Sequence, residues 1–146
     1  MGRAPFFNNL LMASITWTER LSVNVAEIDQ QHQKLLALLG ELGDALSVGK
    51  GHAVLGGITN DLAAYAATHF HTEEEYFVRF GYPDADKHKR EHAFFVKKVS
   101  DFRRELENGK ASLSTDVAQF LSDWLKQHIM GTDKKYGPFF NEHGLK

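Results

Sequence analysis

The stretch LAAYAATHFHTEEEY, residues 62–76, decides the fold class that we predict for this chain. Its apolar and ionisable side chains recur at steps of three and four residues, at Leu62, Tyr65, His69, Glu73 and Tyr76. Because an α-helix completes a turn in about 3.6 residues, these steps keep the side chains on one helical face. The stretch therefore predicts an amphipathic helix whose inner face carries a histidine and a glutamate where leucine is expected.

The same spacing continues through residues 55–80 and recurs in three other segments of the chain. The segment before it carries Ile28, His32, Leu35, Leu39, Leu42 and Leu46. The segment after it carries His88, His92, Phe95, Val99, Phe102 and Leu106, and the last carries Val117, Leu121, Trp124 and His128. Four helices joined by short connections predict an all-α fold, an up-down-up-down antiparallel four-helix bundle.

We expect residues 1–24 to form an N-terminal arm and residues 25–146 to form the bundle. The start of the chain makes a poor signal peptide, because its apolar core is short and is interrupted by two asparagines. Met12 opens a more natural beginning, so we interpret residues 1–11 as an added extension. N-terminal sequencing of natively expressed protein tests this hypothesis.

Composition excludes several classes of protein. A net charge of -2 and a pI near 6.4 are not those of a nucleic-acid-binding protein. The absence of cysteine excludes disulfides, thiolate metal sites and iron–sulfur clusters. No uncharged apolar run approaches the ~18–20 residues of a membrane span. We therefore expect a cytoplasmic protein with neither a nucleic-acid partner nor a membrane partner.

Six ionisable residues occupy inner-face positions, namely His32, His69, Glu73, His88, His92 and His128. A single buried histidine is most often only hydrogen-bonded to its neighbours. Six unsatisfied groups, however, at ~1–3 kcal/mol each, would consume much of the ~5–15 kcal/mol net stability of a domain. The set therefore predicts a shared partner, a metal ion bound by imidazole nitrogens and a carboxylate.

Helical phase divides the charged run His71–Glu75. On an ideal helix Glu73 lies only ~40° from His69, whereas Glu74 and Glu75 lie ~140° and ~120° from it. We therefore predict that Glu73 faces inward and that His71, Glu74 and Glu75 face solvent. His52 and His143 are predicted to be solvated as well.

Spacing leaves open both the number of metal ions and the role of Asp133. This residue follows His128 by five positions, which places it ~140° off the inner face unless the helix loosens, for example at Gly131. If two carboxylates and one solvent-derived oxygen bridge two metals, three imidazoles complete six-coordination of one metal. The remaining two imidazoles leave the other metal an open position for a small ligand.

Four motifs resemble, in order and spacing, those of hemerythrins: IDQQH (28–32), HFHTEE (69–74), HKREH (88–92) and WLKQHIMGTDKKY (124–136). The resemblance covers about residues 15–136 and is to the bacterial hemerythrins. It implies a non-haem di-iron protein that binds dioxygen reversibly, for storage, delivery or scavenging. In that chemistry the reduced iron pair gives two electrons to dioxygen, which is held as a hydroperoxide.

The resemblance also implies seven iron ligands in three groups. One iron would be held by the imidazoles of His88, His92 and His128. The other, which has the open position, would be held by His32 and His69. The two carboxylates, together with an oxo or hydroxo group, would bridge the irons through Glu73 and Asp133. All seven positions match the family's motifs.

An apolar pocket around the open position would keep water and protons from the bound ligand. By motif position its lining is predicted to be Leu35, Phe70, Trp124, Leu125, Ile129 and Tyr136. The simpler interpretation of these residues is that they belong to the ordinary core.

Two alternatives to an oxygen carrier remain open. An oxygen or redox sensor module would need an output domain, for which 146 residues leave no room unless the chain is part of a longer protein. A di-iron peroxidase or oxidase would need a spare acid or base, and the inner faces offer none beyond the ligands. We therefore expect a binding protein rather than an enzyme; a protein partner does not follow from the sequence.

Overall fold

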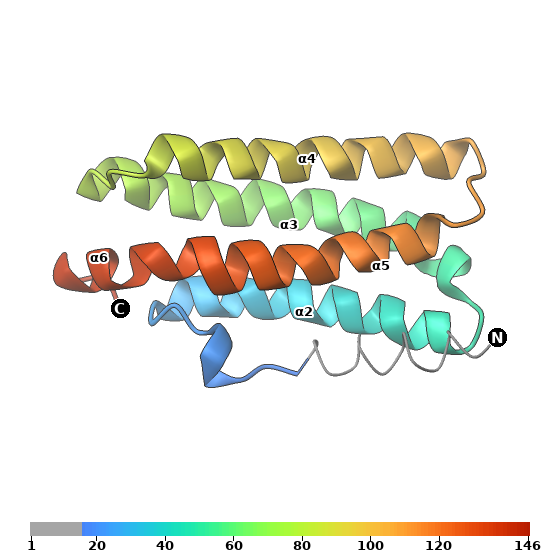
Figure 1. Ribbon diagram of the computed structural model, residues 1–146, viewed down its shortest axis with the longest axis horizontal. Helices are drawn as coiled ribbons and strands as arrows, with labels where there is room; N and C mark the ends of the chain where they lie inside the picture. The colour runs from blue at the N-terminus through green and yellow to red at the C-terminus, as the bar shows by residue number, and fades with distance from the viewer. Residues whose placement is uncertain (1–15) are drawn as a thin grey trace.

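The computed structural model describes residues 16–146; residues 1–15, which include the predicted extension, lie outside the described part. Four rods run along the long axis of the molecule (Figure 1). Three of them are α2 (Ala26–Ser47), α3 (Gly51–Phe80) and α4 (Ala85–Glu107). The fourth is composite and comprises α5 (Leu113–Trp124), the π-helix η2 (Leu125–Thr132), the 3-10 turn η3 (Asp133–Lys135) and α6 (Tyr136–Glu142).

The rods alternate in direction and are joined by short turns, so the predicted antiparallel four-helix bundle is confirmed. Figure 1 shows α3 lying beside α4, and α2 lying beside the composite rod. The turn after α3 illustrates how the sequence ends a helix. Gly81 adopts a left-handed conformation with φ of 70°, and the Tyr82 amide donates a hydrogen bond back to the Phe77 carbonyl at 3.0 Å. Glycine adopts this conformation without the steric penalty of a side chain.

Two apolar clusters fill the bundle and flank a polar layer. The larger cluster includes Leu62, Phe95 and Leu121 and occupies most of the helical core. The smaller one lies at the other side of the polar layer and includes Ile28, Phe77 and Phe140. Aromatic rings from both clusters contact the histidines between them, which separates that layer from solvent.

The described part of the predicted arm packs against the bundle. Leu21 in the 3-10 helix η1 (Glu19–Leu21) belongs to the larger cluster, and Val23 is 1% exposed in the smaller one. The Asp29 carboxylate in the first turn of α2 accepts hydrogen bonds from the Ser22 hydroxyl at 2.6 Å and the Val23 amide at 2.9 Å. The boundary at residue 24 stays a prediction, since these contacts join the two parts closely.

No helix between residues 16 and 146 is both long enough and apolar enough to cross a membrane.

Candidate metal centre

All seven predicted ligand residues lie together in the polar layer, and each is at most 2% exposed. They come from all four rods: α2 contributes His32, α3 contributes His69 and Glu73, and α4 contributes His88 and His92. The composite rod contributes His128 from η2 and Asp133 from η3. The inner-face spacing of the sequence therefore corresponds to true convergence in space.

The π-helix explains how His128 and Asp133 reach the same place. In a π-helix the backbone hydrogen bonds link residues five apart, so each turn contains more residues than an α-helical turn. The spacing of five between these two residues, which is out of phase in an ideal α-helix, becomes a spacing of about one turn. As a result, the His128 Nε2 atom lies 3.0 Å from an Asp133 carboxylate oxygen. The loosened segment begins at Leu125, well before Gly131, where the sequence suggested it.

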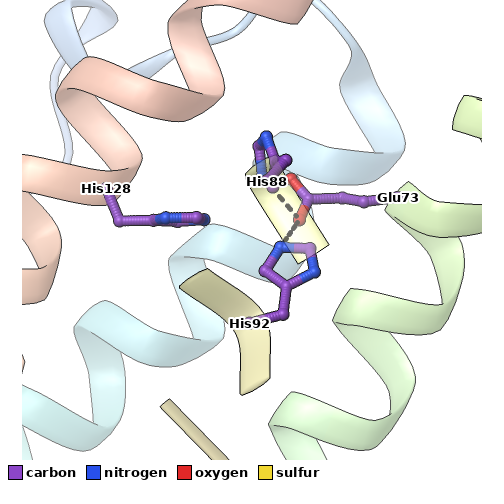
Figure 2. Close-up of side chains that lie close together, drawn as sticks. All are labelled: Glu73, His88, His92 and His128. Atoms are coloured by element: carbon purple, nitrogen blue, oxygen red, sulfur yellow. Dashed lines mark ion pairs between the residues drawn. The ribbon is translucent and has the colours of Figure 1, made fainter. Parts of the chain in front are cut away.

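Each carboxylate lies between imidazoles from different helices. Glu73 Oε1 is 2.9 Å from His92 Nε2, 3.4 Å from His69 Nε2 and 3.7 Å from His88 Nε2. Figure 2 shows Glu73 extending from α3 toward His88 and His92, while the His128 ring faces the same space. Potential ligand atoms of these four residues lie within 4.8 Å of one another.

Asp133 likewise lies between imidazoles from different helices. One of its oxygens is 2.9 Å from His88 Nε2, and the other is 3.0 Å from His32 Nε2. His32 and His69 bring their Nε2 atoms within 3.1 Å of each other. A second group of ligand atoms within 4.8 Å therefore comprises His32, His69, Glu73 and Asp133. Glu73 belongs to both groups, which is the arrangement a bridging carboxylate requires.

Hydrogen bonds at the outer ring nitrogens orient three of the imidazoles. The Nδ1 atom of His69 is 2.6 Å from Gln31 Oε1, that of His92 is 2.8 Å from Glu74 Oε2, and that of His128 is 2.7 Å from Glu91 Oε1. Carboxylate and amide oxygens can only accept, so these Nδ1 atoms carry the proton. The Nε2 lone pairs of the three rings consequently point inward, as metal ligation requires.

These outer partners were not found from the sequence. The prediction that Glu74 faces solvent is wrong: its side chain is 33% exposed and turns sideways to α4, where it accepts from His92. Glu91 and Gln31 directly precede the inner-face histidines His92 and His32. This position beside a predicted ligand is the feature of the sequence that could have identified them. The predictions for His71 and Glu75 are confirmed, since these side chains are 71% and 61% exposed.

The inward-facing atoms test whether a metal fits this layer. Six of them are buried and have no hydrogen bond of acceptable geometry within residues 16–146: Nε2 of His88, His92 and His128, Glu73 Oε1 and both Asp133 carboxylate oxygens. Each unsatisfied buried group costs about 1–3 kcal/mol. A cation shared among them removes these costs together, and a set of imidazole nitrogens and carboxylate oxygens without sulfur suits first-row transition metals.

The charges of the layer shift the pKa values in opposite directions. Burial lowers the pKa of His69 to about 4, even though the charge on Glu73 opposes this shift. Burial also acts to lower the pKa of His88, but the negative carboxylates of Asp133 and Glu73, 2.9 Å and 3.7 Å from its Nε2 atom, outweigh it and raise the pKa to about 10. Burial acts to raise the pKa of Asp133, yet the neighbouring imidazoles hold it well below its usual range. Positive charge between the two buried carboxylates therefore stabilises them.

The six predicted pocket residues are all buried, but they do not form one group. Five belong to the larger apolar cluster: Leu35, Phe70, Trp124, Leu125 and Ile129. Phe70 stacks on His92 with ring centroids 3.8 Å apart, and Trp124 stacks on His128 at 3.9 Å. Tyr136 lies in the smaller cluster, and its hydroxyl donates a hydrogen bond to the Glu73 carboxylate.

One further residue contacts the layer and was interpreted from the sequence as core. The Tyr65 ring stacks on His69 with centroids 5.2 Å apart. Its hydroxyl is buried and has no hydrogen-bond partner in the described part of the chain. Helical spacing predicted the burial of this residue, but it carried no information about the hydroxyl.

Comparisons with known proteins agree with this geometry. Residues 23–140 match the family model described as "Hemerythrin HHE cation binding domain". A bacteriohemerythrin from Stenotrophomonas maltophilia is 33% identical over 90% of this chain and 85% of its own length. Another, from Methylococcus capsulatus, is 34% identical over 87% of this chain and 97% of its own. A crystal structure of wild-type hemerythrin superposes with a TM-score of 0.75 at 33% identity, covering 84% of this chain and 95% of the other.

Proposed function

Since this chain belongs to the hemerythrin family, we propose that it binds dioxygen reversibly at a pair of iron ions in the polar layer. The observation that carries the proposal is the double role of Glu73, which belongs to both groups of potential ligand atoms, the atoms of each group lying within 4.8 Å of one another. A single ion would not need a carboxylate shared in this way.

The distances support the proposed ligand sets. His88, His92 and His128 would hold one iron, and His32 and His69 would hold the other. Glu73 and Asp133, each with imidazoles of both sets nearby, would be the ligands that the two ions share. The set with only two imidazoles would leave its ion a position for a small ligand such as dioxygen.

When bound, the ion pair supplies the electrons that dioxygen takes up on binding and returns on release. The protein's own residues keep this exchange reversible. Tyr136 holds one oxygen of Glu73 by a hydrogen bond, which leaves the other facing the imidazoles. The buried rings of Phe70 and Trp124 cover His92 and His128 and keep water away from the layer.

One observation favours the peroxidase or oxidase alternative. The Tyr65 hydroxyl has no hydrogen-bond partner within residues 16–146. Because the Tyr65 ring stacks on His69, this hydroxyl could donate a hydrogen bond beside the ion proposed at His32 and His69. A hydrogen bond from this hydroxyl would help a reduced oxygen ligand to leave as peroxide. Burial and the charges of Glu73 and Asp133 raise the pKa of Tyr65 well above its usual value, however, so the hydroxyl is a weak proton donor.

An oxygen electrode distinguishes the two functions. Iron-loaded, anaerobically reduced protein is mixed with oxygen in excess, and then with peroxide and a reductant. We expect uptake of one dioxygen per chain, followed by no further consumption. Sustained consumption of oxygen or peroxide, absent from metal-free protein, would identify an enzyme and contradict the proposal.

A further inference from the structure

The three oriented imidazoles differ in the chemistry of their outer partners. His92 and His128 donate to carboxylates, those of Glu74 and Glu91. His69 donates to the neutral amide of Gln31. Both carboxylates thus accept from imidazoles of the proposed His88, His92 and His128 ligand set. The amide accepts from an imidazole of the His32 and His69 set.

The orientation of the Gln31 amide is determined by a chain of hydrogen bonds. The Thr72 hydroxyl donates to the Thr68 carbonyl at 3.0 Å, so its oxygen is free to accept from Gln31 Nε2, also at 3.0 Å. The amide oxygen is thereby turned to His69 Nδ1 at 2.6 Å. Gln31 consequently holds the His69 ring firmly without placing a negative charge behind it.

An imidazole that donates its outer N–H to a carboxylate becomes a more basic ligand and gives more electron density to its metal. The ion held by His88, His92 and His128 receives this from two rings. The ion held by His32 and His69 receives it from neither, since the Nδ1 atom of His32 has no partner in the described part of the chain. An ion held by His32 and His69 would therefore be the more electron-poor of the two.

We propose that Gln31 is a positioning residue that keeps the His32/His69 ion the stronger Lewis acid, which directs small anionic ligands to it and raises the reduction potential of the pair. The inference rests on the proposed di-iron function. It explains the difference between the two ions by the hydrogen bonds of their imidazole ligands as well as by the number of ligands on each ion.

Gln31 is also well placed for a substitution that leaves the core intact. Its side chain is only partly buried and lines a cavity of about 400 Å³ between α2 and α3, together with Lys34, Asp61 and Tyr65. Glutamate has nearly the same shape, can still accept from His69, and can accept from the Thr72 hydroxyl if that group rotates. Gln33→Glu is the matched control, because it adds the same charge to an exposed position of the same helix.

The test compares iron-loaded Gln31→Glu, Gln33→Glu and unmodified protein by iron content, by the reduction potential of the pair and by azide titration of the oxidised form. We expect Gln31→Glu to keep two irons per chain. Its azide dissociation constant should rise by about tenfold or more, the size of effect that outer-partner changes have on metal sites. Its reduction potential should fall by about 59 mV for each tenfold increase in the stability of the oxidised iron relative to the reduced iron. Gln33→Glu should match the unmodified protein in all three measurements.

A Gln31→Glu protein that holds two irons but has the potential and azide affinity of Gln33→Glu would overturn the inference. If Gln31→Glu loses iron, Glu91→Gln decides the question. Removing a carboxylate from behind His128 should raise the potential, and an unchanged or lower potential would overturn the inference. Failure of the underlying function is distinguishable, because unmodified protein would then lack two irons or fail to bind oxygen reversibly.

Discussion

The three adjacent glutamates of α3 have three different environments. Glu73 is fully buried among imidazoles, Glu74 reaches sideways to His92, and Glu75 pairs with His71 in solvent. Helical phase predicts the environments of the first and the last, because Glu73 lies near the inner face of α3 and Glu75 lies well away from it. It fails for Glu74, because a helix in a bundle has neighbours on two sides, and a long side chain can reach one of them.

Replacing Glu73 should have a far larger effect than replacing Glu75. Glu73→Ala removes the shared carboxylate and leaves the Tyr136 hydroxyl without its acceptor. We expect it to lose at least one iron per chain and about 3–5 kcal/mol of stability, as when one partner of a buried charge pair is removed. Glu75→Ala should change the free energy of unfolding by no more than about 0.5 kcal/mol. Iron analysis and urea unfolding test this, and equal effects of the two substitutions would contradict the orientation of α3.

The hydroxyl of Tyr65 offers a second test at the scale of one residue. A buried hydroxyl without a partner costs about 1–3 kcal/mol, so Tyr65→Phe should raise the free energy of unfolding of the metal-free protein by about 1 kcal/mol. Urea unfolding measures this directly. A loss of more than about 1 kcal/mol would mean that the hydroxyl has a partner, such as a buried water.

At the scale of elements, periodicity was sufficient for the bundle but insufficient for Asp133. The inner-face spacing predicted the four rods and six of the seven clustered residues, because α-helical phase is a local property of the chain. Asp133 follows a π-helix, whose residues per turn differ from those of an α-helix, so only the family resemblance suggested its place. The outer partners depend on how adjacent helices are rotated, which a single helical pattern does not contain.

Two glycines of the composite rod should respond differently to alanine. Apart from its chain neighbours and the backbone of its own helix, a Cβ atom at Gly131 would meet nothing within 4 Å in the described part of the chain, whereas one at Gly137 would lie 2.7 Å from the backbone oxygen of Val23. Gly131→Ala should therefore keep its iron and gain up to about 1 kcal/mol of stability. Gly137→Ala should lose about 1–3 kcal/mol through overpacking. Loss of iron in Gly131→Ala would show that the π-helix depends on this glycine.

At the scale of the whole molecule, the buried layer links stability to pH. In the metal-free protein the pKa of His69, lowered by burial, is about 4 against 6.5 in the unfolded chain, so folding is weakened as pH falls from 6.5 to 4. The pKa of His88, raised by Asp133 and Glu73 despite burial, is about 10, so the stabilisation by its proton is lost as pH rises from 6.5 to 10. The joint contribution of these two histidines to the stability of the metal-free protein is therefore largest near pH 6.5.

Metal binding should abolish the loss of stability that the metal-free protein shows as pH rises above 6.5. A ligated His88 has no proton on Nε2 to lose, so the free energy of unfolding of iron-loaded protein should stay constant between pH 7 and 9, whereas that of metal-free protein should fall. Urea unfolding of both forms across this range measures the difference. Parallel profiles would contradict a metal-binding role for His88.

The most direct measurement of the central claim is a cycle of anaerobic reduction, exposure to oxygen and evacuation, followed by visible spectroscopy and iron analysis. We predict two irons per chain and a colour that appears with oxygen and disappears under vacuum through repeated cycles. A protein that holds a single metal ion, or whose spectrum does not respond to oxygen, would contradict the account.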